Sequence, residues 1–159
     1  MLTGYNRSLM SDEFVLRLAQ PSDFAFCQRL YFEGMGWIIE ALKLDMARQR
    51  EGFGQQWQLA EVRIITVAGN DVGWLQTTPA EDAIFIGQLY LEGRFQRQGI
   101  GGRVMRALID EAMRESKAVT LGVLKINPAR RLYERLGFNV THEDQHKIYM
   151  RREPDRMPA

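Results

Sequence analysis

The segment 89–106 constrains the fold most, because an apolar run, a glycine-rich loop and a helical pattern follow one another there without a break. Residues 89–91 end a β-rich run, glycines follow at 99, 101 and 102, and apolar side chains recur from residue 100 at helical spacing. Such glycines leave backbone N–H groups accessible, and the first turn of a helix has N–H groups without intrahelical partners. The segment therefore predicts a strand, an anion-binding loop and a helix, in that order.

The loop differs from two common phosphate-binding motifs. A dinucleotide fingerprint G-x-G-x-x-G that begins at Gly99 would need a glycine at position 104, where the chain has Val104. A Walker A loop would need Gly-Lys-Ser/Thr, which the segment lacks. Arg97 and Arg103 could add charge-assisted hydrogen bonds to a phosphate. The alternative is a tight structural connection between strand and helix with no ligand.

Charge is segregated along the chain although the total is nearly neutral. The formal net charge is +1, yet residues 1–93 hold 7 basic and 12 acidic side chains and residues 94–135 hold 10 basic and 4 acidic ones. The near-neutral total argues against nucleic acid as a partner. An anionic ligand is expected at the basic segment 94–135, and a chance distribution on solvated faces is the alternative.

Length and composition predict one globular domain. We expect the whole chain, 1–159, to be a single domain with its core at about 13–151, an arm over 1–12 and a polar tail over 152–159. The chain begins without a signal-peptide core and has no apolar run of about 18 residues. We therefore expect a cytoplasmic protein with no membrane partner.

Metal binding is not expected. Cys27 is the only cysteine, and beside it the chain has only His142 and His146, which is too few for a Cys-rich or structural zinc site. Cys27 falls in the first expected helix, where a small core residue is favoured over an acyl-accepting nucleophile.

Hydrophobic periodicity predicts a mixed α/β sheet with helices packed on it. Strands are expected at 14–19, 61–67, 72–77, 83–91, 119–124, 138–140 and 147–150. The first helix should begin at Phe24 with Ser22 as its N-cap, and Gly34 and Gly36 should interrupt it. The remaining helices are expected at 37–50 (with Ile38, Leu42 and Met46 on one face), from 100 onward, and from 127 to 136 with Gly137 just after the end.

Two motifs together resemble the GNAT superfamily of N-acetyltransferases. Residues 96–101, Q-R-Q-G-I-G, resemble its acyl-CoA pyrophosphate loop, and residues 127–138, N-P-A-R-R-L-Y-E-R-L-G-F, resemble its second block, N-x-A-x-x-x-Y-x-x-x-G-F. The order of elements matches as well, over about 13–151. The resemblance implies a mixed, mostly antiparallel sheet of six to seven strands, with a V-shaped split between strands four and five and about four flanking helices.

The resemblance also implies acetyl-CoA as the co-substrate. In that family the loop holds the CoA pyrophosphate, and main-chain groups of the fourth strand bind the pantetheine arm and face the thioester oxygen. The residues implied to bind the cofactor are Leu89, Leu91, Gln96, Arg97, Gln98, Gly99, Ile100, Gly101, Gly102, Asn127 and Arg130.

Tyr133 occupies the position of the general acid in that family. A phenol with a pKa of about 10 stays protonated at neutral pH and can protonate the departing CoA thiolate. An aromatic residue on the core face of the helix is the alternative, and Asn127 can likewise be a helix cap instead of a ligand.

The general base is not evident from the sequence. Many members of the family carry a glutamate on the fourth strand, but residues 83–91 contain no carboxylate, and Gln88 cannot act as a base. Glu33, Glu40, a water chain or an amine that arrives neutral are the options.

The implied activity is direct transfer of an acetyl group to a primary amine, on a small molecule or a peptide. Residues expected to contact the acceptor are Tyr31, Trp37, Trp74 and Gln88. Core packing is the alternative for at least half of the apolar side chains between residues 31 and 37. A non-catalytic acyl-CoA-binding or sensing module and transfer of a longer acyl chain are the alternatives. The terminal hairpin offers an edge through which a homodimer could form. The identity of the amine is left open.

Overall fold

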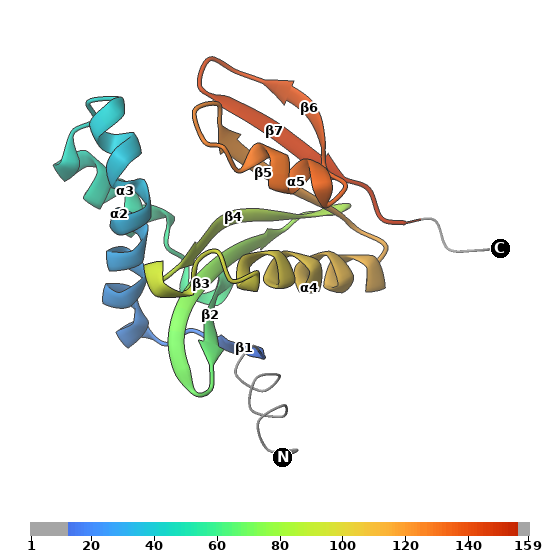
Figure 1. Ribbon diagram of the computed structural model, residues 1–159, viewed down its shortest axis with the longest axis horizontal. Helices are drawn as coiled ribbons and strands as arrows, with labels where there is room; N and C mark the ends of the chain where they lie inside the picture. The colour runs from blue at the N-terminus through green and yellow to red at the C-terminus, as the bar shows by residue number, and fades with distance from the viewer. Residues whose placement is uncertain (1–12, 156–159) are drawn as a thin grey trace. The chain divides into compact units, whose positions relative to one another are not determined.

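The computed structural model describes residues 13–155, which form an α/β fold with one seven-stranded sheet of order β1-β2-β3-β4-β5-β7-β6 (Figure 1). The strands are β1 (Phe14–Leu18), β2 (Val62–Val67), β3 (Asn70–Pro79), β4 (Ala83–Leu91), β5 (Ala118–Leu124), β6 (Asn139–Glu143) and β7 (Lys147–Arg152). Strands β4 and β5 are parallel, in a register of Ala83–Ile86 against Ala118–Leu121. The pairs β1–β2, β2–β3, β5–β7 and β6–β7 are antiparallel. The predicted mixed, mostly antiparallel sheet is confirmed.

Four α-helices accompany the sheet in the part of the chain that the structure describes, as predicted. They are α2 (Phe24–Ala41), α3 (Met46–Gln56), α4 (Ile100–Arg114) and α5 (Arg130–Arg135). Residues 13–76 together with 88–100 form one compact unit, and residues 77–87 together with 101–155 form a second. The single domain expected over 1–159 stays a prediction.

The first unit has an aromatic core beneath α2 and α3. Its fully buried members come from both helices and from β2 and β3, and the half-buried Tyr90 of β4 packs against them. The stacked rings of Trp74 and Tyr90 have centroids 5.7 Å apart. Tyr31 meets Phe53 at 4.9 Å and Tyr90 at 5.5 Å. These contacts hold α2 and the second half of β4 together in the first unit.

The predicted break at Gly34 and Gly36 is wrong, because α2 continues through both glycines to Ala41. A side chain at Gly34 would place its Cβ 2.8 Å from a ring carbon of Tyr90, so this glycine permits a close approach of helix and ring. A glycine in a helix costs only about 1 kcal/mol relative to alanine, which packing of this kind offsets.

The predicted second helix over 37–50 is also wrong, because the chain turns between α2 and α3. Leu42 and Met46 are exposed instead of sharing a buried face with Ile38. A new helix begins after Asp45, whose carboxylate accepts hydrogen bonds from the N–H groups of Ala47 and Arg48. This cap explains why the helix restarts there.

Ser22 is not the N-cap of α2. Asp23 precedes the helix and its carboxylate accepts from the Gln20 N–H at 2.8 Å. Both Asp23 oxygens also take bonds of 2.9 Å from Arg17, and this pairing lowers the pKa of Asp23. The buried carboxylate therefore joins β1 to the start of α2.

In the second unit β7 lies between β5 and β6 (Figure 1). Strand β7 includes Arg152, one residue beyond the expected end of the core, and Arg152 is paired with Val119 of β5. The predicted arm over 1–12 and the tail residues 156–159 lie outside the described residues.

Candidate cofactor and catalytic site

The glycine-rich loop joins β4 to α4 as the sequence predicts. Strand β4 ends at Leu91, a short 3-10 turn covers Gly93–Phe95, and α4 begins at Ile100. The backbone is left-handed at Arg97, with φ of 61°, and at Gly99, with φ of 81°. Only glycine adopts this conformation freely, and another residue pays about 1–2 kcal/mol for it. The loop thus keeps a tight shape that costs free energy at Arg97.

Side chains of the loop bond to its own main chain. Gln96 donates from Nε2 to the carbonyl of Leu91 at 3.0 Å, and Gln98 donates from Nε2 to the carbonyl of Arg94 at 2.7 Å. Both glutamines were predicted to bind the cofactor, and each has a main-chain partner close in sequence, at the end of β4 or in the loop. Their role in binding the cofactor stays a prediction. The Leu91 carbonyl, which was expected to bind the pantetheine arm, already accepts the hydrogen bond from Gln96.

There is open space around Gly99 in the loop and around Gly102 in the first turn of α4. A Cβ built on Gly99 or on Gly102 would meet no other atom within 4 Å. The side chain of Ile100 is buried in the core, so only its main chain is available to a ligand. Helix α4 has 15 residues and presents the positive end of its dipole at this loop. An anion can therefore approach the N–H groups at the start of α4.

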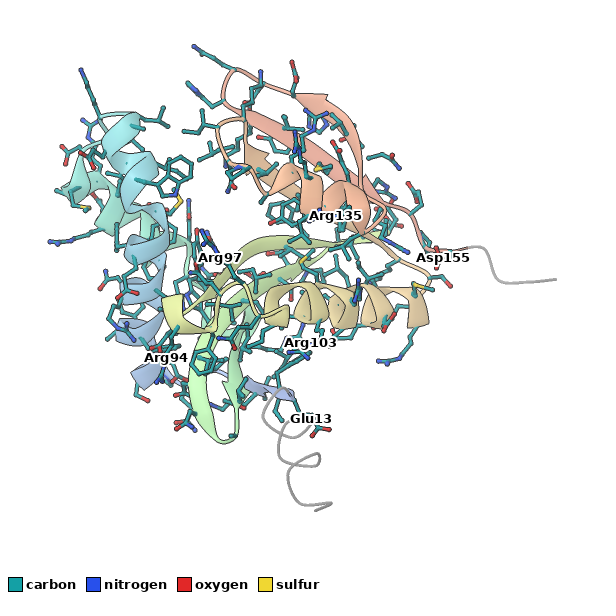
Figure 2. All side chains as sticks on the ribbon, viewed as in Figure 1. Glu13, Arg94, Arg97, Arg103, Arg135 and Asp155 are labelled. Carbon is teal, nitrogen blue, oxygen red and sulfur yellow. The ribbon has the colours of Figure 1, made fainter. Side chains whose placement is uncertain are left out.

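Two arginines flank the loop glycines in the sequence, Arg97 in the loop and Arg103 in the first turn of α4, and both are labelled in Figure 2. Arg97 is exposed on the loop. Arg103 stands in the first turn of α4, and its Nε and Nη2 atoms are buried without a hydrogen-bond partner within residues 13–155. An unpaired buried donor is costly, so the Arg103 guanidinium is suited to an additional acceptor.

An ion-pair network links α2 to the beginning of the loop. Arg29 of α2 contacts Glu33 at 3.0 Å and Glu92 at 2.8 Å, and Glu92 directly follows β4. Arg29 lowers the pKa of Glu92, and the Glu92 N–H donates to the Val72 carbonyl at 2.8 Å. Glu33, a candidate general base, is thus engaged by a guanidinium. Neither the Arg29 contacts nor the glutamine bonds could be read from the motif.

The second motif begins with a turn and not with a helix. The Asn127 side chain accepts from the Ala129 N–H at 2.9 Å, and α5 starts only at Arg130, three residues later than expected. Asn127 therefore stabilises the turn before α5 and is not the N-cap of the helix, which is Ala129. Arg130 is partly exposed and pairs with Glu134 at 2.6 Å.

Tyr133 lies in α5 with its ring half-buried. The ring packs edge-on against Phe138 at 6.0 Å, and burial raises the pKa of the phenol. Its hydroxyl has no hydrogen-bond partner among residues 13–155. The phenol is thus protonated at neutral pH and has a free donor, as a general acid requires.

The four predicted acceptor residues have different surroundings. Trp74 is 0% exposed and Tyr31 is 8% exposed, both in the aromatic core, whereas Trp37 is 47% exposed and Gln88 is half-buried. The Trp74 indole N–H is buried without a partner in the described part of the chain. A role of these four in binding the acceptor stays a prediction.

Cys27 and His142, the other candidate reactive residues, are placed where a structural role is favoured. Cys27 is fully buried, which raises the pKa of its thiol to about 12. The His142 ring stacks on Tyr149 at 4.4 Å on the exposed side of β6 and β7. Within residues 13–155 no three Cys, His, Asp or Glu side chains form a metal-binding group, and no helix there is long and apolar enough to cross a membrane.

A family model described as the acetyltransferase (GNAT) domain matches residues 59–140, which include β4, the loop, α4 and α5. The strand, the glycine-rich loop and the helix thus all lie within the matched acetyltransferase domain. The chain is a member of the GNAT acetyltransferase family and is an acyltransferase.

Solved structures share the fold at low sequence identity. A PaiA N-acetyltransferase from Thermoplasma acidophilum, in complex with coenzyme A, is 13% identical with a TM-score of 0.74, over 89% of this chain and 99% of that one. The ribosomal-protein-S18-alanine N-acetyltransferase from Escherichia coli is 19% identical with a TM-score of 0.61, over 92% and 97%. N-acetylglutamate synthase from Neisseria gonorrhoeae, with coenzyme A and N-acetyl-glutamate, is 18% identical with a TM-score of 0.66, over 91% and 36%. No curated protein sequence matches significantly.

Proposed function

We propose that the protein transfers an acetyl group from acetyl-CoA directly to a primary amine on a small molecule or a peptide. The observation that carries this proposal is the open space at Gly99 of the loop, where a Cβ would meet no other atom within 4 Å. The solved neighbours with coenzyme A support the choice of ligand.

The loop is suited to the pyrophosphate of CoA. Its shape is set before binding, by the Gln96 and Gln98 hydrogen bonds and by the left-handed backbone at Gly99. A preformed loop loses little conformational entropy when it binds, and the N–H groups at a helix start match phosphate oxygens. Arg97 adds a charge at the loop surface.

In the proposed reaction the amine nitrogen attacks the thioester carbon, and the C–S bond then breaks. A backbone N–H of β4, at Leu89, would stabilise the oxyanion of the intermediate. Tyr133 would give its proton to the departing CoA thiolate, and the amine would lose a proton to water or to a base still to be identified. Direct transfer agrees with the buried Cys27, since a thiol with a pKa of about 12 is a poor acyl acceptor.

The test combines two measurements on the full chain. Calorimetry should show saturable binding of acetyl-CoA, and a colorimetric thiol assay should show CoA release with at least one amine in a panel of amino acids, peptide N-termini and polyamines. Absence of binding would overturn the cofactor assignment. Binding without thiol release from any amine would instead support the non-catalytic alternative. Propionyl- and butyryl-CoA in the same assay test the acyl-chain preference.

Location and assembly remain proposals. A cytoplasmic protein with no nucleic-acid partner and no metal is the simplest expectation for this activity, and the exposed strand β6 would be available for a homodimer.

A further inference from the structure

We propose that Arg152, on β7, is a positioning residue that holds Tyr133 in place by fixing the C-terminal end of α5. The inference rests on the proposed role of Tyr133 as the proton donor to the CoA thiolate. It concerns a residue that lies outside both family motifs and beyond the expected core.

Helix α5 is too short to hold its own shape. It has six residues, and isolated helices of fewer than about 12–15 residues are marginal in water. Its two ends must therefore be fixed by other groups. The Asn127 side chain closes the turn before the helix, through the Ala129 N–H.

The C-terminal end forms a Schellman motif. The Phe138 N–H donates to the Tyr133 carbonyl at 3.0 Å, and the Gly137 N–H donates to the Glu134 carbonyl at 3.0 Å. Gly137 is left-handed, with φ of 95°. The hydrophobic contact that accompanies this motif is the one between the rings of Tyr133 and Phe138. The tyrosine of the proposed chemistry is thus also part of the helix end.

Arg152 completes this helix end from the sheet. Its Nε donates to the Leu136 carbonyl at 2.8 Å, and its side chain is only 19% exposed. The same Nε lies 3.1 Å from the point where a Cβ on Gly137 would stand, so the arginine passes directly over the glycine. The backbone of Arg152 is fixed in β7 opposite Val119. A strand that is paired on both sides therefore holds the end of α5, and α5 holds the phenol.

The test uses Arg152→Met, with Arg151→Met as the matched control. Arg151 is the neighbouring residue of β7 and pairs with Asp82 and Glu153 instead of with α5. Arg152→Met removes the charge-assisted hydrogen bond to the Leu136 carbonyl, together with contacts to the Glu153 carbonyl and to Asp155 that do not involve α5. Loss of the bond to Leu136 predicts a roughly tenfold lower kcat, with little change in the KM for acetyl-CoA. Arg151→Met should keep its kcat. Arg152→Lys retains a charged donor and should recover part of the loss.

A double-mutant cycle separates positioning from general stability. If Arg152 acts through Tyr133, Arg152→Met should lower kcat in the wild-type background and not in Tyr133→Phe. An equal loss in both backgrounds would overturn the proposal.

A spectroscopic readout does not depend on turnover. Ring-labelled tyrosine followed by NMR, assigned with Tyr133→Phe, reports the pKa of Tyr133. Arg152→Met should move this pKa down toward the ordinary value of about 10, because a loosened helix end exposes the phenol, and Arg151→Met should not. An unchanged pKa in Arg152→Met would overturn the coupling. If wild-type protein transfers no acetyl group, the proposed function fails while this titration still decides the positioning role.

Discussion

The loop after β4 and the end of α5 both contain a left-handed glycine, but they are held in different ways. The loop is fixed by partners close in sequence, since Gln96 and Gln98 reach back five and four residues. The end of α5 depends on Arg152, whose partner lies 16 residues away. Space above Gly99 is open, whereas the space above Gly137 is occupied by Arg152. The space at Gly99 is therefore free for a ligand, whereas the space at Gly137 is filled by the side chain of Arg152.

The largest expected effect is at α5. Tyr133→Phe removes the proposed proton donor and should lower kcat by about 100-fold or more, with the acetyl-CoA dissociation constant unchanged. Steady-state kinetics and calorimetry measure the two. Because burial raises the pKa of Tyr133, the wild-type rate should persist to alkaline pH and decline only above about 10, as the phenol loses its proton. Turnover that is unaffected by the substitution would remove Tyr133 from the mechanism.

The next effect is at the loop. Gly99→Glu introduces backbone strain at a φ of 81° and a negative charge beside the expected pyrophosphate, so acetyl-CoA affinity should fall at least about tenfold. Calorimetry measures the dissociation constant of acetyl-CoA. Gly54→Glu is the control, because it adds the same charge at an exposed glycine of α3 that also has open space. Equal affinities in the two variants would show that the loop does not hold the anion.

A pair of alanine substitutions sharpens the contrast between glycines. Gly137→Ala should cost about 1–2 kcal/mol of unfolding free energy for the left-handed backbone, before any displacement of Arg152. Gly102→Ala, in the first turn of α4 with open space around it, should stabilise the fold by up to about 1 kcal/mol. Guanidinium denaturation gives both values. A change in unfolding free energy of the same sign in both variants would contradict the proposed difference between Gly137 and Gly102.

The smallest expected effect concerns the shape of the loop. Gln98→Met removes the donor to the Arg94 carbonyl, a hydrogen bond worth about 1 kcal/mol, so acetyl-CoA affinity should fall roughly fivefold. Gln55→Met, at an exposed position of α3, should leave the affinity unchanged. Equal affinities of Gln98→Met and the wild-type protein for acetyl-CoA would contradict a role of this hydrogen bond in shaping the loop.

The sequence predicted the elements whose signals are local. Strand β4, the start of α4 and the turn after α5 were correct, because alternation, the glycines and the apolar stripe all lie within the elements themselves. The sheet class followed from the order of these elements and from the two motifs.

The rest depended on contacts between distant residues. Gly34 does not break α2, because Tyr90, far along the chain, packs against it. Periodicity predicted one helix over 37–50, whereas Asp45 caps a separate helix, α3, that begins at Met46. The sequence left both core packing and acceptor binding open for Tyr31, and Trp74 was expected at the acceptor site, yet both side chains are buried in the core. Arg152 looked like the first residue of a tail. Each case is a tertiary contact that no local pattern encodes.

The burial of Cys27 makes this chain unusually convenient for chemical labelling. The only thiol is inaccessible and stays protonated at neutral pH, so reagents that detect free CoA would meet no background from the folded protein. A single cysteine introduced at Gly36 or Gly54, where a side chain would have open space, would then be the one reactive position for a fluorophore or spin label. Movements of α2 and α3 during an acetylation cycle could be followed in an otherwise native chain.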